Sequence, residues 1–146
     1  PGHFLVRPTL ADMAIFVDVF HQGEVLFEED CRDLIRTLYG ADARMLPQHL
    51  EAIGAKPFLA RILTNLKMIY LQRPDIPRAL AAIDRILLLI PNSLAERRDR
   101  GLIYYREGKL LKARDDLKYY LLNHPDAPDT FEIQQLISQI NMLLDS

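Results

Sequence analysis

The side chains best suited to chemistry are few and far apart along this 146-residue chain. There is one cysteine, Cys31, and the four histidines are His3, His21, His49 and His124. None of these residues has metal-ligand spacing with another, and no Gly-rich phosphate-binding loop is present. We therefore predict no metal site and no cofactor. Cys31 falls on the apolar face of an expected helix, which indicates a small buried hydrophobic residue.

A cluster of arginines is the sharpest charge feature of the chain. Its members are Arg97, Arg98, Arg100 and Arg106. Acidic residues are interspersed among them, so one interpretation is a solvated helix face. The alternative is a binding surface, because a guanidinium group can hold a carboxylate through two parallel hydrogen bonds.

The elements that must position these residues are set by an internal repeat. Two stretches match at an offset of 34 residues, with a small residue in mid-repeat and a proline at the end. The matching pairs are Ile69 and Ile103, Tyr70 and Tyr104, Ala79 and Ala113, Leu87 and Leu121, Leu88 and Leu122, and Pro91 and Pro125. The pattern is similar to the tetratricopeptide repeat (TPR), a pair of helices. Stacked helix pairs present an extended surface that binds other proteins.

The expected helices follow from apolar periodicity and terminal signals. Asp75 is expected to cap one helix, whereas Ser93 with Glu96 and Asp129 with Glu132 are expected to form capping boxes. The repeats span about 60–93 and 94–127. The expected helices are 57–73, 75–90, 93–107, 110–123 and a capping helix at 130–144. Two repeats are fewer than the roughly three that usually bury a continuous core, so we expect them to pack with the rest of the chain into one compact unit.

The N-terminal third has a different character. Residues 3–8 and 13–20 are rich in β-formers and predict an antiparallel hairpin, with a brief third strand at 25–27. A helix with an acidic first turn begins at Glu28 and ends at Gly40. Residues 41–55 are expected to be irregular apart from one helical turn. The fold class is therefore α+β, mainly α, with a first region at 1–55 and a helical region at 56–146.

In a TPR unit the first helix of each pair lines the binding groove. Tyr105 could anchor an apolar side chain there, and the arginines could hold an acidic one. We therefore predict an acidic protein or peptide partner with an apolar anchor. The residues predicted to line the groove are Arg61, Thr64, Met68, Leu71, Arg98, Leu102, Tyr105 and Arg106.

Composition narrows the function classes. The net charge of −2 gives no reason to expect nucleic acid or an anionic membrane as partner. No apolar run approaches the roughly 18 residues needed to span a bilayer. A single cysteine suits a reducing compartment, so we expect a cytoplasmic protein. Because the chain opens with Pro-Gly-His, we expect a piece of a longer protein, so an organelle-targeting segment is not excluded. The oligomeric state is left open.

Several runs of the sequence resemble the SirB family, in which a transglutaminase-like domain precedes TPR units. These runs are PGHFLVR (1–7), FVDVFHQGEVLFEEDCRDL (16–34), NLKMIYLQRPDIPRAL (65–80), PNSLAERRDRGLIYYREG (91–108) and DLKYYLLNHPDAPD (116–129). The resemblance covers nearly the whole chain. It implies that the strands are the end of a transglutaminase-like core.

Such cores use a Cys, a His and an Asp in that chain order. By this resemblance His3 matches the His position and Asp18 the Asp position, whereas the Cys position has no match in this chain. The loop after Asp18 also departs from the family's D-P-F-N-G-G, with Val19 in place of Pro and His21-Gln22 in place of Asn-Gly. Either His3 and Asp18 form a structural pair, or an upstream Cys completes a catalytic site.

The leading hypothesis is a non-enzymatic interaction or scaffold protein, whose TPR helices bind a protein partner beside a degenerate transglutaminase-like core. The first alternative is a cysteine-dependent acyl-transferase or protease-like enzyme with an upstream nucleophile. The second is a regulatory or assembly factor of a larger complex.

Overall fold

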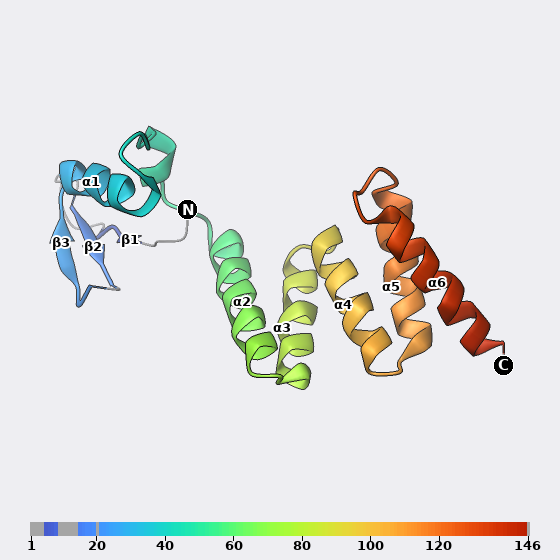
Figure 1. Ribbon diagram of the computed structural model, residues 1–146. Coiled ribbons are helices and arrows are strands. Elements are labelled where there is room, and N and C mark those ends of the chain that lie inside the picture. The colour runs from blue at the N-terminus through green and yellow to red at the C-terminus, as the bar shows by residue number, and fades with distance from the viewer. Residues whose placement is uncertain (1–4, 9–14, 20, 146) are drawn as a thin grey trace. The chain divides into compact units, whose positions relative to one another are not determined.

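The computed structural model describes residues 5–8, 15–19 and 21–145 (Figure 1). The contacts divide the chain into two compact units, Pro1–Ile53 and Gly54–Ser146. The expectation of one compact unit is therefore wrong. The physical reason is that Cys31 belongs to a small core of the first unit, and the helical repeats bury cores of their own.

The first unit contains a three-stranded antiparallel sheet in the order β1-β2-β3. Its strands are β1 (Leu5–Val6), β2 (Phe16–Asp18) and β3 (Glu24–Leu26). Alternation in β2 buries Phe16 and Asp18 on one face, and Phe16 lies opposite Leu26 in the register. The expected hairpin is present, with strands shorter than predicted within the described residues. The third strand begins one residue before its predicted start.

Helix α1 (Glu28–Tyr39) follows the sheet and ends where the sequence predicts. Its first turn is acidic, which complements the positive end of the helix dipole. Gly40 ends it with a φ of 99°, a conformation that glycine adopts without strain. Cys31 packs from α1 onto Phe16 and Leu26. A short 3₁₀ helix, η1 (Pro47–Leu50), supplies the one predicted turn in the irregular segment.

The second unit is helical, and the helices predicted from periodicity are all present. Pairs α2–α3 and α4–α5 are each packed closely, and α6 lies beside α5 (Figure 1). The helices are α2 (Ala55–Gln72), α3 (Ile76–Leu89), α4 (Leu94–Arg106), α5 (Leu110–Asn123) and α6 (Thr130–Leu144).

One of the three predicted caps is confirmed, and a second, at Ser93, is wrong. The Asp75 carboxylate accepts the backbone N–H of Arg78 at 3.2 Å, as expected for an N-cap. Ser93 stands at the N-cap of α4, but its side chain makes no capping hydrogen bond. Its expected partner Glu96 is buried and accepts a hydrogen bond from the Lys67 ammonium at 2.8 Å. A charged donor competes more strongly for the carboxylate than the backbone N–H does.

Small residues set the spacing within each helix pair. Ala79 of α3 and Ala113 of α5 are fully buried at repeat-equivalent positions. Gly101 of α4 lies so close to α5 that a Cβ atom there would come within 2.8 Å of the Leu117 side chain. The alanines were predicted from the repeat, whereas Gly101 was not singled out because its first-repeat equivalent is Lys67.

Candidate functional site

Asp18 is the predicted orienting carboxylate of the transglutaminase-like region. The alternation of β2 turns it to the buried face, and only 1% of the residue is exposed. A buried carboxylate requires hydrogen-bond donors. His21 supplies two: its Nδ1 lies 2.7 Å from Asp18 Oδ2, and its backbone N–H donates to Asp18 Oδ1 at 3.3 Å. The structure therefore joins Asp18 to His21 in the turn that follows the strand.

This pairing changes the titration of the imidazole. The hydrogen bond to Asp18 and the charge of its carboxylate raise the pKa of His21 above its ordinary value of 6.5. The sequence did not predict this pair, although a separation of three residues across a tight turn is a recognisable signal. His3, the predicted catalytic histidine, lies outside the described residues.

Cys31 is buried within the core of the first unit. Burial, followed by the nearby acidic residues of α1, raises the pKa of its thiol. A raised pKa disfavours the thiolate that nucleophilic chemistry requires. Among the residues that the structure describes, no cluster of three or more His, Cys, Asp and Glu side chains could hold a metal ion.

The predicted partner-binding residues lie on the first helices of the two pairs. On α2, Met68 is half exposed and Arg61 is partly buried. On α4, Leu102 and Tyr105 pack against the C-terminal core, and Arg106 is exposed at the helix end. These residues therefore differ in access, and Met68 and Arg106 present the most surface.

Arg98 is engaged within the fold. Its guanidinium forms an ion pair with Asp129 at the start of α6. The Tyr120 hydroxyl donates to the same carboxylate at 2.7 Å. The predicted capping box of Asp129 with Glu132 is therefore wrong, because Asp129 turns toward the tyrosine and arginine and makes no side-chain cap. Burial opposes ionisation of Asp129, but the Tyr120 hydrogen bond and Arg98 outweigh it and lower its pKa.

Two further arginines of the cluster are also engaged. Asp116 of α5 is buried and accepts hydrogen bonds from Arg97 at 3.1 Å and from Arg100 at 2.6 and 2.8 Å. Arg100 also reaches Asp84 of α3 at 2.6 Å. The hydrogen bond to Asp116 is the main cause of the raised pKa of Arg100. Much of the arginine cluster therefore serves to join helices.

Lys67 is a residue that the sequence reasoning missed. It is 5% exposed, and its ammonium donates to Glu96 at 2.8 Å and to Asp99 at 2.9 Å, so it links α2 to α4. Burial alone would lower the pKa of this lysine, but the two carboxylates outweigh burial and raise it. A lysine that replaces the glycine of the next repeat was the available signal.

The fold and these helix contacts define a helical-repeat protein with a small α+β region ahead of the repeats. Comparison with known families gives two matches. Residues 66–138 match the tetratricopeptide repeat, and residues 1–64 match the transglutaminase-like superfamily. The chain belongs to the tetratricopeptide repeat family, with a transglutaminase-like segment ahead of the repeats. This confirms the domain order that the SirB resemblance implies.

Among curated proteins, the chain is similar to UPF0162 proteins of bacteria. It is 40% identical over 128 residues to one from Xylella fastidiosa, covering 86% of this chain and 46% of that protein. The relative from Vibrio cholerae is 28% identical over 144 residues, covering 98% and 52%. The chain thus spans about half the length of these relatives. No solved structure gives a significant match to it. No helix in the described part of the chain is long and apolar enough to cross a membrane.

Proposed function

We propose that this protein is an interaction scaffold, whose helices α2 and α4 bind a segment of a partner protein. The observation that carries the proposal is the pair of in-phase helix hairpins, each tightened by a buried alanine. Stacks of this kind act in general as protein-binding surfaces, because each repeat adds area to one continuous face.

Met68 and Arg106 are the proposed contact residues. Met68 is 51% exposed on α2, and a flexible thioether suits an adaptable apolar contact. Arg106 is exposed on α4, and within the part of the chain that the structure describes it forms no ion pair. The acidic preference of the partner therefore rests on Arg106 more than on Arg98, which is paired with Asp129.

Because Arg98 is paired within the fold and Arg106 is not, the two arginines are not equally useful as test positions. Charge reversal at Arg98 would break a contact that holds α6, so loss of binding there would have two explanations. Arg106→Glu and Met68→Ala change exposed side chains instead. Matched controls lie on α5, where Lys118 is exposed and Leu122 is 82% exposed.

The experiment is affinity capture from an extract of the source cells, with partners identified by mass spectrometry. We expect the Met68→Ala and Arg106→Glu double variant to recover a specific partner at least about tenfold less well, as for a contact residue near the centre of an interface. Lys118→Glu with Leu122→Ala should recover it as the unmodified chain does. Equal recovery by the two double variants would show that α2 and α4 do not form the binding surface.

A further inference from the structure

Helix α6 stands in register with α4 at the 34-residue offset of the repeat. Ile103 of α4 and Ile137 of α6 are equivalent, and both are buried. The side of α4 that packs on α5 includes Arg97, Arg100 and Gly101, which contact Asp116 or Leu117. Because α6 follows the same repeat, the side of α6 at the equivalent positions is suited to pack against another helix.

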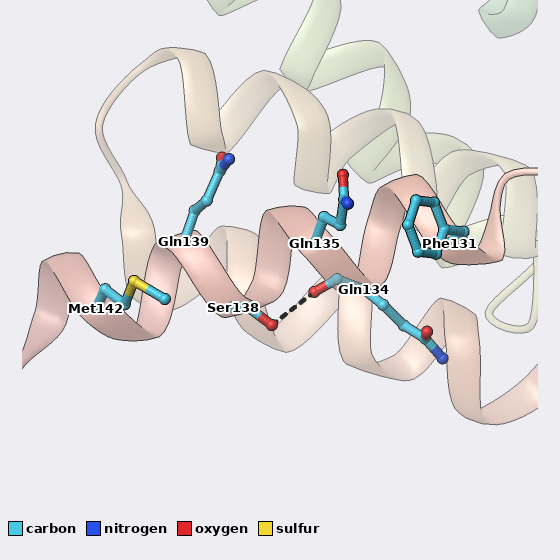
Figure 2. A pocket seen from close by; sticks show the side chains of 6 residues that line it. All are labelled: Phe131, Gln134, Gln135, Ser138, Gln139 and Met142. Atoms are coloured by element: carbon cyan, nitrogen blue, oxygen red, sulfur yellow. Dashed lines mark hydrogen bonds between the residues drawn. The ribbon is translucent and has the colours of Figure 1, made fainter.

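On α6 that matching side is exposed. Its residues at the offset of 34 are Phe131, Gln134 and Gln135. With three neighbours they line a shallow hollow of about 410 Å³, shown in Figure 2. The six lining residues are Phe131, Gln134, Gln135, Ser138, Gln139 and Met142.

The chemistry of this face is unusual for an exposed face of a helical stack. A terminal repeat keeps the stack in solution by presenting a polar outer face. Here none of the six side chains is charged, and both apolar ones are well exposed: Phe131 is 66% exposed and Met142 is 71% exposed. An uncharged face with an apolar residue at each end is better suited to contact than to solvation.

The order of residues on the face reads almost the same in both directions. Phe131 and Met142 stand at its two ends, equally far from the midpoint between Leu136 and Ile137. Inside them, Gln134 mirrors Gln139 and Gln135 mirrors Ser138. In an antiparallel pair of such helices, each residue lies level with its counterpart from the other copy.

Such a pairing satisfies the requirements of a two-fold interface, in which one patch must complement itself. The ring of Phe131 would meet the thioether of Met142, a favourable sulfur–aromatic contact. The three central glutamines and Ser138 can both donate and accept hydrogen bonds, so they can satisfy one another in either direction. Because none of the six lining side chains is charged, no like charges among them oppose the approach of the two copies.

We propose that this face of α6 pairs antiparallel with the same face of a second copy of the chain. This surface is separate from the Met68 and Arg106 surface, so either proposal can fail without the other. One helix pair about 22 Å long buries less than the roughly 1,600 Å² of a standard interface. The dimer is therefore weak, and its population rises with protein concentration.

Disulfide cross-linking tests the register directly. Because the native Cys31 is buried, it should not form disulfides that compete with those of the introduced cysteines. A mixture of the Phe131→Cys and Met142→Cys variants should form a mixed disulfide several-fold faster than either variant alone. Leu122→Cys, on the exposed side of α5, serves as the control and should cross-link slowly.

Molar mass by light scattering tests the surface without cross-linking. Gln135→Lys brings two ammonium groups together near the two-fold axis and should shift the chain to monomer at every concentration. Gln72→Lys makes the same charge change at the exposed end of α2 and should leave the dimer intact. Circular dichroism is the check that both variants keep their helices.

Three results would overturn the proposal. The first is a chain that stays monomeric at all concentrations, with no preference for the mixed disulfide. The second is a dimer that persists in Gln135→Lys, which would place the contact elsewhere. The third is a monomeric chain whose Phe131→Cys variant cross-links to a different protein in extract, which would assign the face to another partner.

Discussion

The two helix pairs repeat one backbone pattern but stabilise it with different chemistry. In the first pair the buried face of α3 is apolar, with Ala82 and Ile86 among its residues. The equivalent positions of α5 carry Asp116 and Tyr120, which are also buried. Two polar groups have thus replaced two apolar ones at the same places in the repeat.

The replacement is tolerated because the partner positions are polar as well. Arg97 and Arg100 of α4 hold Asp116, and their equivalents on α2 are Leu63 and Leu66. A buried carboxylate without such donors would cost several kcal/mol. The comparison teaches that when the buried residue on one helix changes from apolar to polar, its contact residues on the facing helix change with it.

At the position of Gly101 the difference is the opposite one, because here the first pair carries the charged residue. The second pair has Gly101 against Leu117, whereas the first pair has Lys67 at the equivalent place. Lys67 is accommodated because its ammonium reaches Glu96 and Asp99 of α4, the first helix of the second pair. The first pair therefore uses this position to bind its neighbour, and the second uses it to bring its own helices together.

The largest expected effect comes from removing the buried carboxylate. Asp116→Ala leaves Arg97 and Arg100 partly buried without their main acceptor, and it should lower the free energy of unfolding by about 3–5 kcal/mol. Urea unfolding followed by circular dichroism measures the loss.

A transplant of the first pair's chemistry provides the control. Asp116→Ala combined with Arg97→Leu and Arg100→Leu recreates the apolar set of Ala82, Leu63 and Leu66. Replacing a buried ion network by apolar residues is often neutral or stabilising. Stability should therefore return close to that of the unmodified chain. A triple variant as unstable as Asp116→Ala would contradict the idea that the residues exchange as a set.

Gly101→Ala should destabilise the second pair by about 1–3 kcal/mol, because the added methyl group overpacks against Leu117. At a helix position with open space the same change would stabilise by about 1 kcal/mol. A lower midpoint of thermal unfolding would therefore indicate overpacking against Leu117, and a higher one would indicate that the greater helix propensity of alanine dominates. In a double-mutant cycle with Leu117→Ala, the cost of the added methyl should shrink; strictly additive effects would refute the close contact.

Tyr120→Phe should cost about 1 kcal/mol, because it removes the hydrogen bond to Asp129 while Arg98 remains to hold the carboxylate. Tyr119→Phe is a matched control on the same helix, since its hydroxyl makes only a long 3.4 Å contact with Asn92 at the surface. Chemical denaturation should separate the two variants. Equal losses would mean that the Tyr120 hydroxyl contributes no more than an exposed one.

The smallest expected effect is a loss of folding stability at low pH. The pKa of Asp129 is lowered from 3.8 in the folded chain, so its contribution is fully present above that value. The contribution is lost as the pH falls from about 3.8 through the lower folded pKa. Comparing the acid unfolding of the unmodified chain with that of Asp129→Asn should show a steeper loss in the former. Parallel curves would exclude Asp129 as a source of the acid sensitivity.

Much of the fold was accessible from the sequence because it rests on local signals. Gly40 ended α1 as predicted, and Asp75 capped α3. The candidate site was less accessible. The cluster of arginines was visible, but the sequence could not show that Arg98 is paired with Asp129, because the two residues come from different helices.

The sequence by itself determined the helices, their phase and the small residues at Ala79 and Ala113, because apolar periodicity and the 34-residue offset are encoded along the chain. Only the tertiary structure decided which charges meet. Glu96 has the spacing of a capping box with Ser93, yet it binds Lys67, which is 29 residues away. A local hydrogen bond at a helix end is available from the sequence alone, whereas a buried charge pair forms only after packing has excluded water and brought two helices together.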